Sequence, residues 1–344
     1  MFIIKVSTLL LSGLSVVGAH TVQYRRAETG LNAQMKTTGR YFGTFADTKY
    51  LDDEPYAKIL GNLQEHGSIT PGNSMKWEST EKSRGSFTFE TADSIVKFAE
   101  EHGQKIRGHT LVWYSQLPQW VKNIQTKDTI LEVMNNHITK QMAHWKGGNV
   151  WQWDVVNEPF DDSGNYRESV FYNLLGKDFI ATAFKTARKV DPAAKLYLNE
   201  YNNESGAKGD AFYNLAKELV ESGVPIDGVG IQGHYILGKI PTSLQKSMQA
   251  LADLGLDVAI TELDIRIENP TTESKLQQQA DDFEYVIKAC LAISKCVGIT
   301  SSAFTDKYSW VPTTFEGFDN ANPWNKSLEK KPAYYGISKA ISSV

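Results

Sequence analysis

Eight times along this chain, a short apolar run rich in β-branched residues is followed by a stretch whose apolar residues recur at helical spacing. The predicted strands cover residues 41–47, 68–73, 105–113, 150–158, 195–201, 228–235, 258–265 and 298–306. The predicted helices cover residues 54–66, 91–102, 126–145, 169–190, 211–222, 242–254, 274–293 and 331–342. This alternation predicts an α/β fold, and eight such units predict a closed (β/α)8 TIM barrel in a single domain. An open, doubly wound sheet is the alternative, but no Gly-x-Gly-x-x-Gly follows the first predicted strand.

Composition narrows the function without naming it. The chain has 344 residues, a formal net charge of −4 and 41% hydrophobic residues, which is enough for a full globular core. Neither a nucleic acid nor a membrane surface is predicted as a partner, because both usually require a basic patch.

The N-terminus has the features of a targeting segment. Lys5 precedes an apolar run that ends at Val17, and small residues follow it. We therefore predict a secretory signal peptide over residues 1–19, with a buried N-terminal helix as the alternative. The pair Arg25-Arg26 suggests a pro-segment over residues 20–26, which leaves the barrel domain at residues 27–344.

The sequence contains two cysteines, Cys290 and Cys296. In a secreted chain, a close and even pair favours a disulfide, and the short loop would contribute roughly 2 kcal/mol. No further ligands for a zinc site are evident nearby. Asn203 and Asn325 begin Asn-x-Ser sequons and are glycosylation candidates.

Two of the predicted strands end in carboxylates. Residues 151–159 contain Asp154 and Glu158, and residues 258–266 contain Glu262 and Asp264. Because alternate residues of a strand share a face, Asp154, Val156 and Glu158 are expected to point the same way, as are Glu262 and Asp264.

Polar and aromatic side chains gather at the ends of most predicted strands, where barrel enzymes carry their active sites. They are Asn73, Lys76, Trp77, His109, Trp113, Asn157, Glu158, Asn199, Glu200, Tyr201, Asn202, Gln232, His234, Glu262, Asp264 and Trp310. Such a mixture suits a sugar, since rings cover pyranose faces while amides and acids bind hydroxyl groups. A metal site is the alternative, but no His-x-His or His-Glu-x-x-His string supports it.

Glu158 and Glu262 would face each other across the barrel mouth from the fourth and seventh strands. A single glutamate at a strand end is more often a salt-bridge partner or a helix cap. Two glutamates at opposite strand ends instead match the pair of carboxylates that hydrolyses a glycosidic bond.

These residues resemble glycoside hydrolase family 10, the retaining endo-β-1,4-xylanases, from about residue 30 to residue 341. The matching motifs occur in the family's order. They are Gly39-Arg40-Tyr41-Phe42-Gly43-Thr44, Asn73-Ser74-Met75-Lys76-Trp77, Arg107-Gly108-His109-Thr110-Leu111-Val112-Trp113, Trp153-Asp154-Val155-Val156-Asn157-Glu158, Gly228-Val229-Gly230-Ile231-Gln232-Gly233-His234, Thr261-Glu262-Leu263-Asp264 and Asp306-Lys307-Tyr308-Ser309-Trp310. The cysteine pair is similar to that of fungal members.

The resemblance implies Glu158 as the acid/base and Glu262 as the nucleophile. It implies that Asn157 contacts the sugar 2-hydroxyl and that His234 and Asp264 orient Glu262. The residues implied for the subsites on the non-reducing side are Asn73, Lys76, His109, Trp113, Gln232 and Trp310. No metal and no organic cofactor are implied for the chemistry.

The chain departs from the family pattern at three positions. Gly72 occupies a position where many members have Glu, and Tyr114 one where a His often follows the Trp. Ser302 aligns with a position that usually holds a Trp. Without that indole, we expect weaker binding on the glycone side or greater tolerance of branched xylan.

We therefore expect a secreted, extracellular, monomeric enzyme that hydrolyses internal linkages of xylan with retention of configuration. A β-1,4-glucanase of the same architecture is one alternative, because loss of the indole at position 302 could relax the wall that excludes the hydroxymethyl group of glucose. A barrel that binds polysaccharide without turnover is the other alternative.

Overall fold

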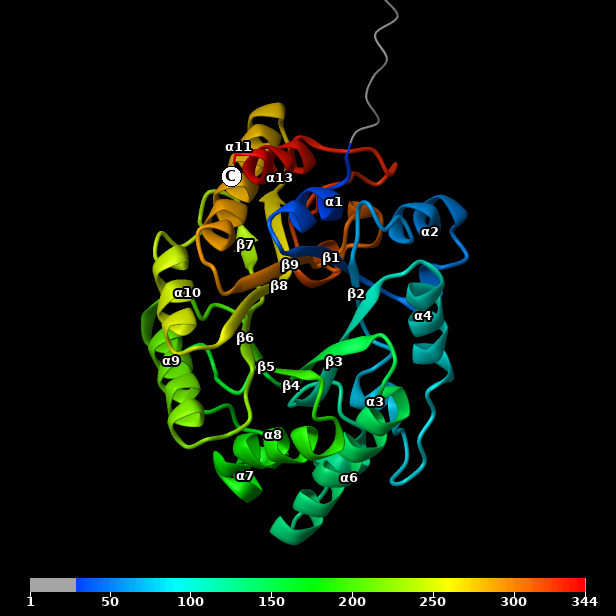
Figure 1. The fold of residues 1–344 in the computed structure, drawn as a ribbon, viewed down its shortest axis with the longest axis vertical. Coiled ribbons are helices and arrows are strands. Elements are labelled where there is room, and N and C mark those ends of the chain that lie inside the picture. Colours follow the sequence, from blue (N-terminus) through cyan, green and yellow to red (C-terminus); the bar gives the residue numbers. More distant parts are fainter. Residues whose placement is uncertain (1–28, 344) are drawn as a thin grey trace, which may run out of the picture.

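The computed structural model describes residues 29–343, and within them eight parallel strands close into a barrel (Figure 1). The barrel strands are β1 (Tyr41–Ala46), β2 (Ser68–Pro71), β3 (Lys105–Trp113), β4 (Val150–Asn157), β5 (Lys195–Glu200), β6 (Gly228–Ile231), β8 (Asp257–Glu268) and β9 (Cys296–Ser301). Closure comes from β9, which pairs with β8 on one side and with β1 on the other. The predicted (β/α)8 barrel is confirmed. The predicted signal peptide and pro-segment lie outside the described residues.

Helices between successive strands cover the outside of the barrel (Figure 1). The main ones are α2 (Glu54–Leu60), α4 (Glu90–Glu101), α6 (Lys127–Trp145), α8 (Asp178–Val190), α9 (Gly206–Glu221), α10 (Leu244–Asp253), α11 (Glu273–Leu291) and α13 (Pro332–Ser342). Each turns buried apolar residues toward the sheet, as Ile180, Ala183 and Phe184 do in α8. This burial is what makes the helical spacing visible in the sequence.

Several short elements decorate this frame. They are α1 (Leu31–Thr37), α3 (Trp77–Thr80), α5 (Gln119–Lys122), α7 (Val170–Leu175), α12 (Val311–Thr314), β7 (His234–Ile236), β10 (Phe318–Asp319) and the 3₁₀ turns η1 (Thr48–Tyr50) and η2 (Asp306–Tyr308). None of the described helices is long and apolar enough to cross a membrane.

Glycines interrupt two elements that were predicted to be continuous. The predicted strand 228–235 divides into β6 and β7 at Gly233, whose φ is 79°. The predicted helix 169–190 divides into α7 and α8 at Gly176, whose φ is 66°. Because a left-handed residue cannot continue either a strand or a helix, both predictions of continuity were wrong.

A buried polar layer fills the barrel interior. The Arg107 guanidinium donates to both carboxylate oxygens of Asp154, at 3.2 and 2.5 Å, and to Oε1 of Gln152 at 2.9 Å. It also stacks over the ring of Tyr197, with its central carbon 4.4 Å from the ring centroid. Both charged groups are almost completely buried, so removing either one would leave the other as an uncompensated charge inside the barrel.

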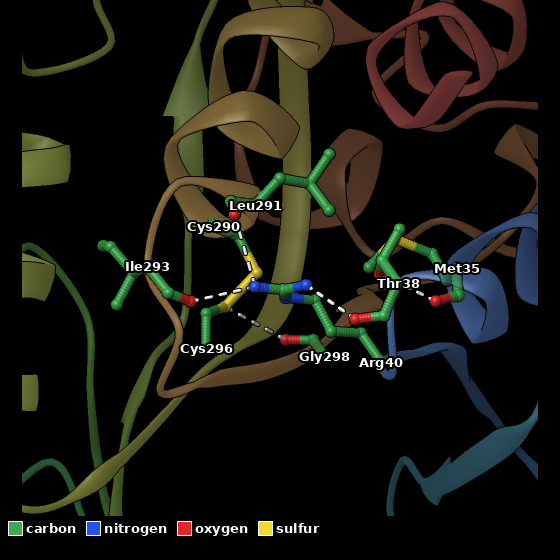
Figure 2. Close-up of a disulfide and its surroundings, with 8 residues drawn as sticks. All are labelled: Met35, Thr38, Arg40, Cys290, Leu291, Ile293, Cys296 and Gly298. Atoms are coloured by element: carbon green, nitrogen blue, oxygen red, sulfur yellow. Dashed lines mark hydrogen bonds between the residues drawn. A yellow bond between two sulfur atoms is a disulfide. The ribbon is translucent and has the colours of Figure 1, made fainter. Parts of the chain in front are cut away.

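The cysteines form the predicted disulfide, with their Cα atoms 5.4 Å apart (Figure 2). The bond closes the turn between α11 and β9. Beside it, the Arg40 guanidinium donates to the carbonyl oxygens of Leu291 at 3.2 Å and Ile293 at 3.0 Å (Figure 2). The disulfide loop is thereby tied to the segment between α1 and β1.

Candidate active site

A cleft of about 690 Å³ opens at the C-terminal ends of the barrel strands. Of the eleven residues to which the resemblance gives a role, all but Asp264 line it: Asn73, Lys76, His109, Trp113, Asn157, Glu158, Gln232, His234, Glu262 and Trp310. Three others that were expected at the barrel mouth do not line it: Trp77, Asn199 and Glu200. Asp264 lies just behind the surface, where its Oδ2 accepts from His234 at 3.0 Å and from the Trp310 indole at 2.8 Å.

The end of β4 explains how Asn157 and Glu158 both reach the cleft. The β4–β5 ladder shifts register between Asp154 and Val156, so the strict alternation of faces is lost there. Val156 lies toward Phe171 and Phe179 of the outer helices, whereas Asp154 faces the barrel interior. The expectation that these residues share one face was therefore wrong for Val156.

Glu158 follows the strand with φ 54°, in the left-handed region. Its N–H still donates to the carbonyl of Asn199 at 2.9 Å, which holds this turn against β5. The carboxylate receives the Trp113 indole on Oε2 at 2.9 Å and the Gln232 amide on Oε1 at 2.9 Å. Asn157 donates to the same Oε1 at 3.3 Å.

Glu262 lies on β8 and is held by His234 and Asn199. His234 Nε2 lies 3.3 Å from Oε2 of Glu262, and Asn199 Nδ2 donates to Oε1 at 2.9 Å. The other ring nitrogen of His234 contacts Asp264, so one imidazole bridges the two β8 carboxylates. This arrangement agrees with the expectation that Glu262 and Asp264 share a face.

The electrostatics of Glu262 and His234 are mutually dependent. Burial alone would raise the pKa of Glu262, but the hydrogen bond from His234, the charges of His109 and His234 and the Asn199 amide together hold it at about 2. Burial alone would lower the pKa of His234, but Asp264 and Glu262 raise it to about 10. At neutral pH the site therefore contains an ionised Glu262 beside an imidazolium.

The side chain of Asn199 links Glu262 to Asn157, which in turn contacts Glu158. Asn199, at the end of β5, donates through Nδ2 to Asn157 at 2.9 Å as well as to Glu262. Its Oδ1 accepts from the Thr261 hydroxyl at 2.7 Å, which fixes the orientation of the amide. Sequence reasoning placed Asn199 at the barrel mouth but gave it no role. The direct pairing of Asn157 with Asn199 across β4 and β5 is visible only in the register.

Lys76, Asn73 and Asp47 form a polar wall on another side of the cleft. Asn73 donates to Asp47 through its backbone N–H at 3.0 Å and through Nδ2 at 2.9 Å. Lys76 Nζ donates to Gln116 at 2.6 Å and lies 4.8 Å from the Trp113 ring centroid. Burial lowers the pKa of Lys76, although the charges of nearby carboxylates oppose this shift.

The three departures from the family pattern all line the cleft. A Cβ added at Gly72 would lie 3.2 Å from the carboxyl atoms of Asp47, so a larger residue there would press on the group that holds Asn73. Ser302 and Ala303 present small side chains at the end of β9. Tyr114 lies against Arg167, a residue that sequence reasoning missed because it comes from the loop after β4.

Among the described residues, no group of three or more His, Cys, Asp or Glu side chains is arranged to hold a metal ion.

Asn203, one of the two sequon residues, is 2% exposed and donates to the carbonyl of Gly230. Its side chain is therefore not accessible in the folded barrel.

Comparisons with known proteins identify the family of the chain. The sequence pattern of Glycosyl hydrolase family 10 matches residues 30–340. The chain is 49% identical to an endo-1,4-beta-xylanase of Agaricus bisporus, over 87% of this chain and 90% of that protein. It is 48% identical to endo-1,4-beta-xylanase A of Phanerodontia chrysosporium, over 90% of this chain and 76% of that protein.

Among solved structures, xylanase 10B from Thermotoga petrophila RKU-1 in complex with xylobiose superposes with a TM-score of 0.89. The two chains are 37% identical, and the match covers 92% of this chain and 98% of that one. An endo-1,4-beta-xylanase of Penicillium canescens gives a TM-score of 0.88 at 36% identity, over 92% and 98% of the chains. By sequence and by structure, this chain belongs to glycosyl hydrolase family 10.

Proposed function

We propose that Glu158 and Glu262 together carry out the family's reaction, the retaining endo-hydrolysis of β-1,4-xylosidic linkages in xylan. The observation that carries this assignment is that the two carboxylates have different hydrogen-bond partners. Glu262 is held ionised by an imidazolium, with a pKa of about 2, which is the state a nucleophile requires. Glu158 receives neutral donors from an indole and two amides.

In the first step, the Glu262 carboxylate attacks the anomeric carbon while Glu158 donates its proton to the glycosidic oxygen. The carbon–oxygen bond breaks, the shortened chain leaves as an alcohol, and a glycosyl ester remains on Glu262. In the second step, Glu158 removes a proton from water, and the water oxygen displaces Glu262 from the same carbon. Two inversions return the β configuration.

Glu262 loses its charge when the ester forms. Glu158 has by then given its proton to the leaving group, so it is the carboxylate that accepts a proton from water in the second step. His234 and Asp264 serve as positioning residues for Glu262 through the bridge described above. In this proposal Asn157 contacts the sugar 2-hydroxyl, and Asn73, Lys76, His109, Trp113, Gln232 and Trp310 line the non-reducing-side subsites.

The test is a proton NMR time course of the mature protein with xylan, run in parallel with a soluble cellulose derivative. The β-anomer of the new reducing end should appear first, from xylan. An α-anomer appearing first would mean inversion and would remove the nucleophile role from Glu262. Cleavage of the cellulose derivative alone would favour the glucanase alternative, and no product from either would favour a binding protein.

The pH profile of kcat/KM should depend on His234. Because His234 stabilises the ionised form of Glu262, H234Q should raise the pKa of Glu262 and move the acid limb of the profile up by about one pH unit. The matched control is H144Q, since His144 pairs with Asp93 near the surface. An acid limb that stays in place in H234Q would contradict the proposed role of the imidazolium.

Adding an indole at position 302 should strengthen binding on the glycone side. The indole of S302W would cover a part of the cleft wall where Ser302 and Ala303 now present only small side chains. We expect KM for linear xylotetraose to fall roughly fivefold, the size of one aromatic contact, and branched xylan to be cleaved less readily. S222W, at the exposed C-terminal end of α9, is the control, and an unchanged KM and product pattern in S302W would refute this expectation.

We further propose that the protein is secreted and acts as a monomer, after removal of a signal peptide over residues 1–19 and a pro-segment over residues 20–26. The lysine followed by an apolar run and small residues supports the signal peptide, and the disulfide supports an oxidising compartment.

A further inference from the structure

Among the described residues, four large apolar side chains are exposed: Tyr114, Tyr285, Trp310 and Tyr335. Tyr285 and Tyr335 lie on the outer helices α11 and α13, whereas Tyr114 and Trp310 line the cleft. Trp310 is joined to the Glu262 side, because its indole donates to Asp264. Tyr114 follows Trp113 at the end of β3 and lies against Arg167, which is bound to the backbone of Glu158.

Arg167 joins Tyr114 to the backbone of Glu158. The central carbon of the guanidinium lies 4.4 Å from the centroid of the Tyr114 ring. The same guanidinium donates to the carbonyl oxygens of Glu158 at 3.2 Å and Phe160 at 2.5 Å, and to the Tyr201 hydroxyl at 2.9 Å. With three of its N–H donors occupied in this way, the guanidinium is a fixed support for one face of the ring.

Tyr201 continues the same wall. Its hydroxyl donates to Asp162 at 2.6 Å, and Lys208 Nζ lies 3.2 Å from its ring centroid. Lys208 is itself buried in an ion pair with Glu200 at 3.0 Å. Tyr114 and Tyr201 are therefore two lining rings, each with a cation on one face.

The side of the scissile bond follows from the chemistry. A general acid protonates the oxygen of the departing sugar, so the leaving group lies beside Glu158, and Arg167 holds Tyr114 next to the backbone of Glu158. We propose that Tyr114, held by Arg167, is a specificity-determining residue that contacts the departing xylose unit. This inference rests on the proposed roles of Glu158 and Glu262.

The test compares two substrates that differ in their leaving groups. Xylotetraose releases a sugar, whereas β-xylobiosyl fluoride releases a single atom that cannot reach Tyr114. For Y114A, we expect kcat/KM on xylotetraose to fall about 10-fold more than on the fluoride, which corresponds to one lost ring contact. Y114F keeps the ring and should restore the wild-type ratio, and Y285A on the outer surface is the matched control.

Each other outcome contradicts the proposal in a distinct way. Equal losses on both substrates would mean that Tyr114 supports a part of the cleft that both substrates occupy. A loss confined to xylotetraose but accompanied by an altered pH profile of kcat/KM would mean that Tyr114 acts through Arg167 on Glu158, because fluoride leaves without an acid. No loss on either substrate would mean that the ring contacts no sugar. A wild-type protein that cleaves neither substrate would overturn the proposed function together with this inference.

Discussion

Replacing Glu262 by alanine is expected to lower kcat on xylan by about 10⁵-fold, because no other described carboxylate that lines the cleft is held beside an imidazolium, and Asp264, the second partner of His234, lies behind the cleft surface. The vacated space should admit a small anion. With an activated aryl xylobioside, added azide should therefore restore turnover and give the α-configured glycosyl azide, since a single displacement inverts the carbon.

The matched control is E268A, at the exposed end of the same strand, and initial rates with and without azide provide the measurement. Xylan hydrolysis by E262A within about 10-fold of the wild type would contradict the nucleophile assignment. So would a β-configured azide product, because it would require a second displacement by another group.

Replacing Glu158 by alanine should produce a loss that depends on the leaving group. A xylose unit leaves poorly without a proton, so kcat/KM on xylan should fall by about 10⁴-fold. Dinitrophenolate leaves without help, so formation of the glycosyl ester from a dinitrophenyl xylobioside should remain fast while its hydrolysis slows. Stopped-flow absorbance should then show a burst of dinitrophenolate in E158A.

The same burst measurement in E262A provides the comparison, since a variant without its nucleophile cannot accumulate the ester. If E158A lost as much kcat/KM on the aryl substrate as on xylan, the result would contradict an acid/base role for Glu158. It would instead place Glu158 among the residues that only bind the sugar.

The order and number of the barrel strands were predictable because each strand is a buried apolar run and each helix has one apolar face. The site residues were predictable as a group, since parallel strands of a barrel end at a common edge. What the pattern lacks is local geometry. The N-terminal helix α1 was missed, although Leu31 and Met35 are fully buried, because two apolar positions over seven residues are too few to show a period.

The contacts that organise the site were also beyond the sequence. The register shift near Asp154 changes which β4 residues face inward, and only the ladder reveals it. Asn199 connects Asn157 to Glu262 through side chains that are 42 and 63 residues apart from it in sequence. Arg167 comes from a loop without periodicity, so nothing in its neighbours indicated that it would support Tyr114.

The left-handed backbone of Glu158 has a consequence for engineering this barrel. A non-glycine residue in that conformation costs of order 1 kcal/mol, and glycine would remove the cost. Selection for heat resistance alone would therefore favour losing the group that this reaction requires. Libraries screened only for survival at high temperature should accumulate inactive members at this position, so a thermal screen of this protein needs a simultaneous assay of turnover.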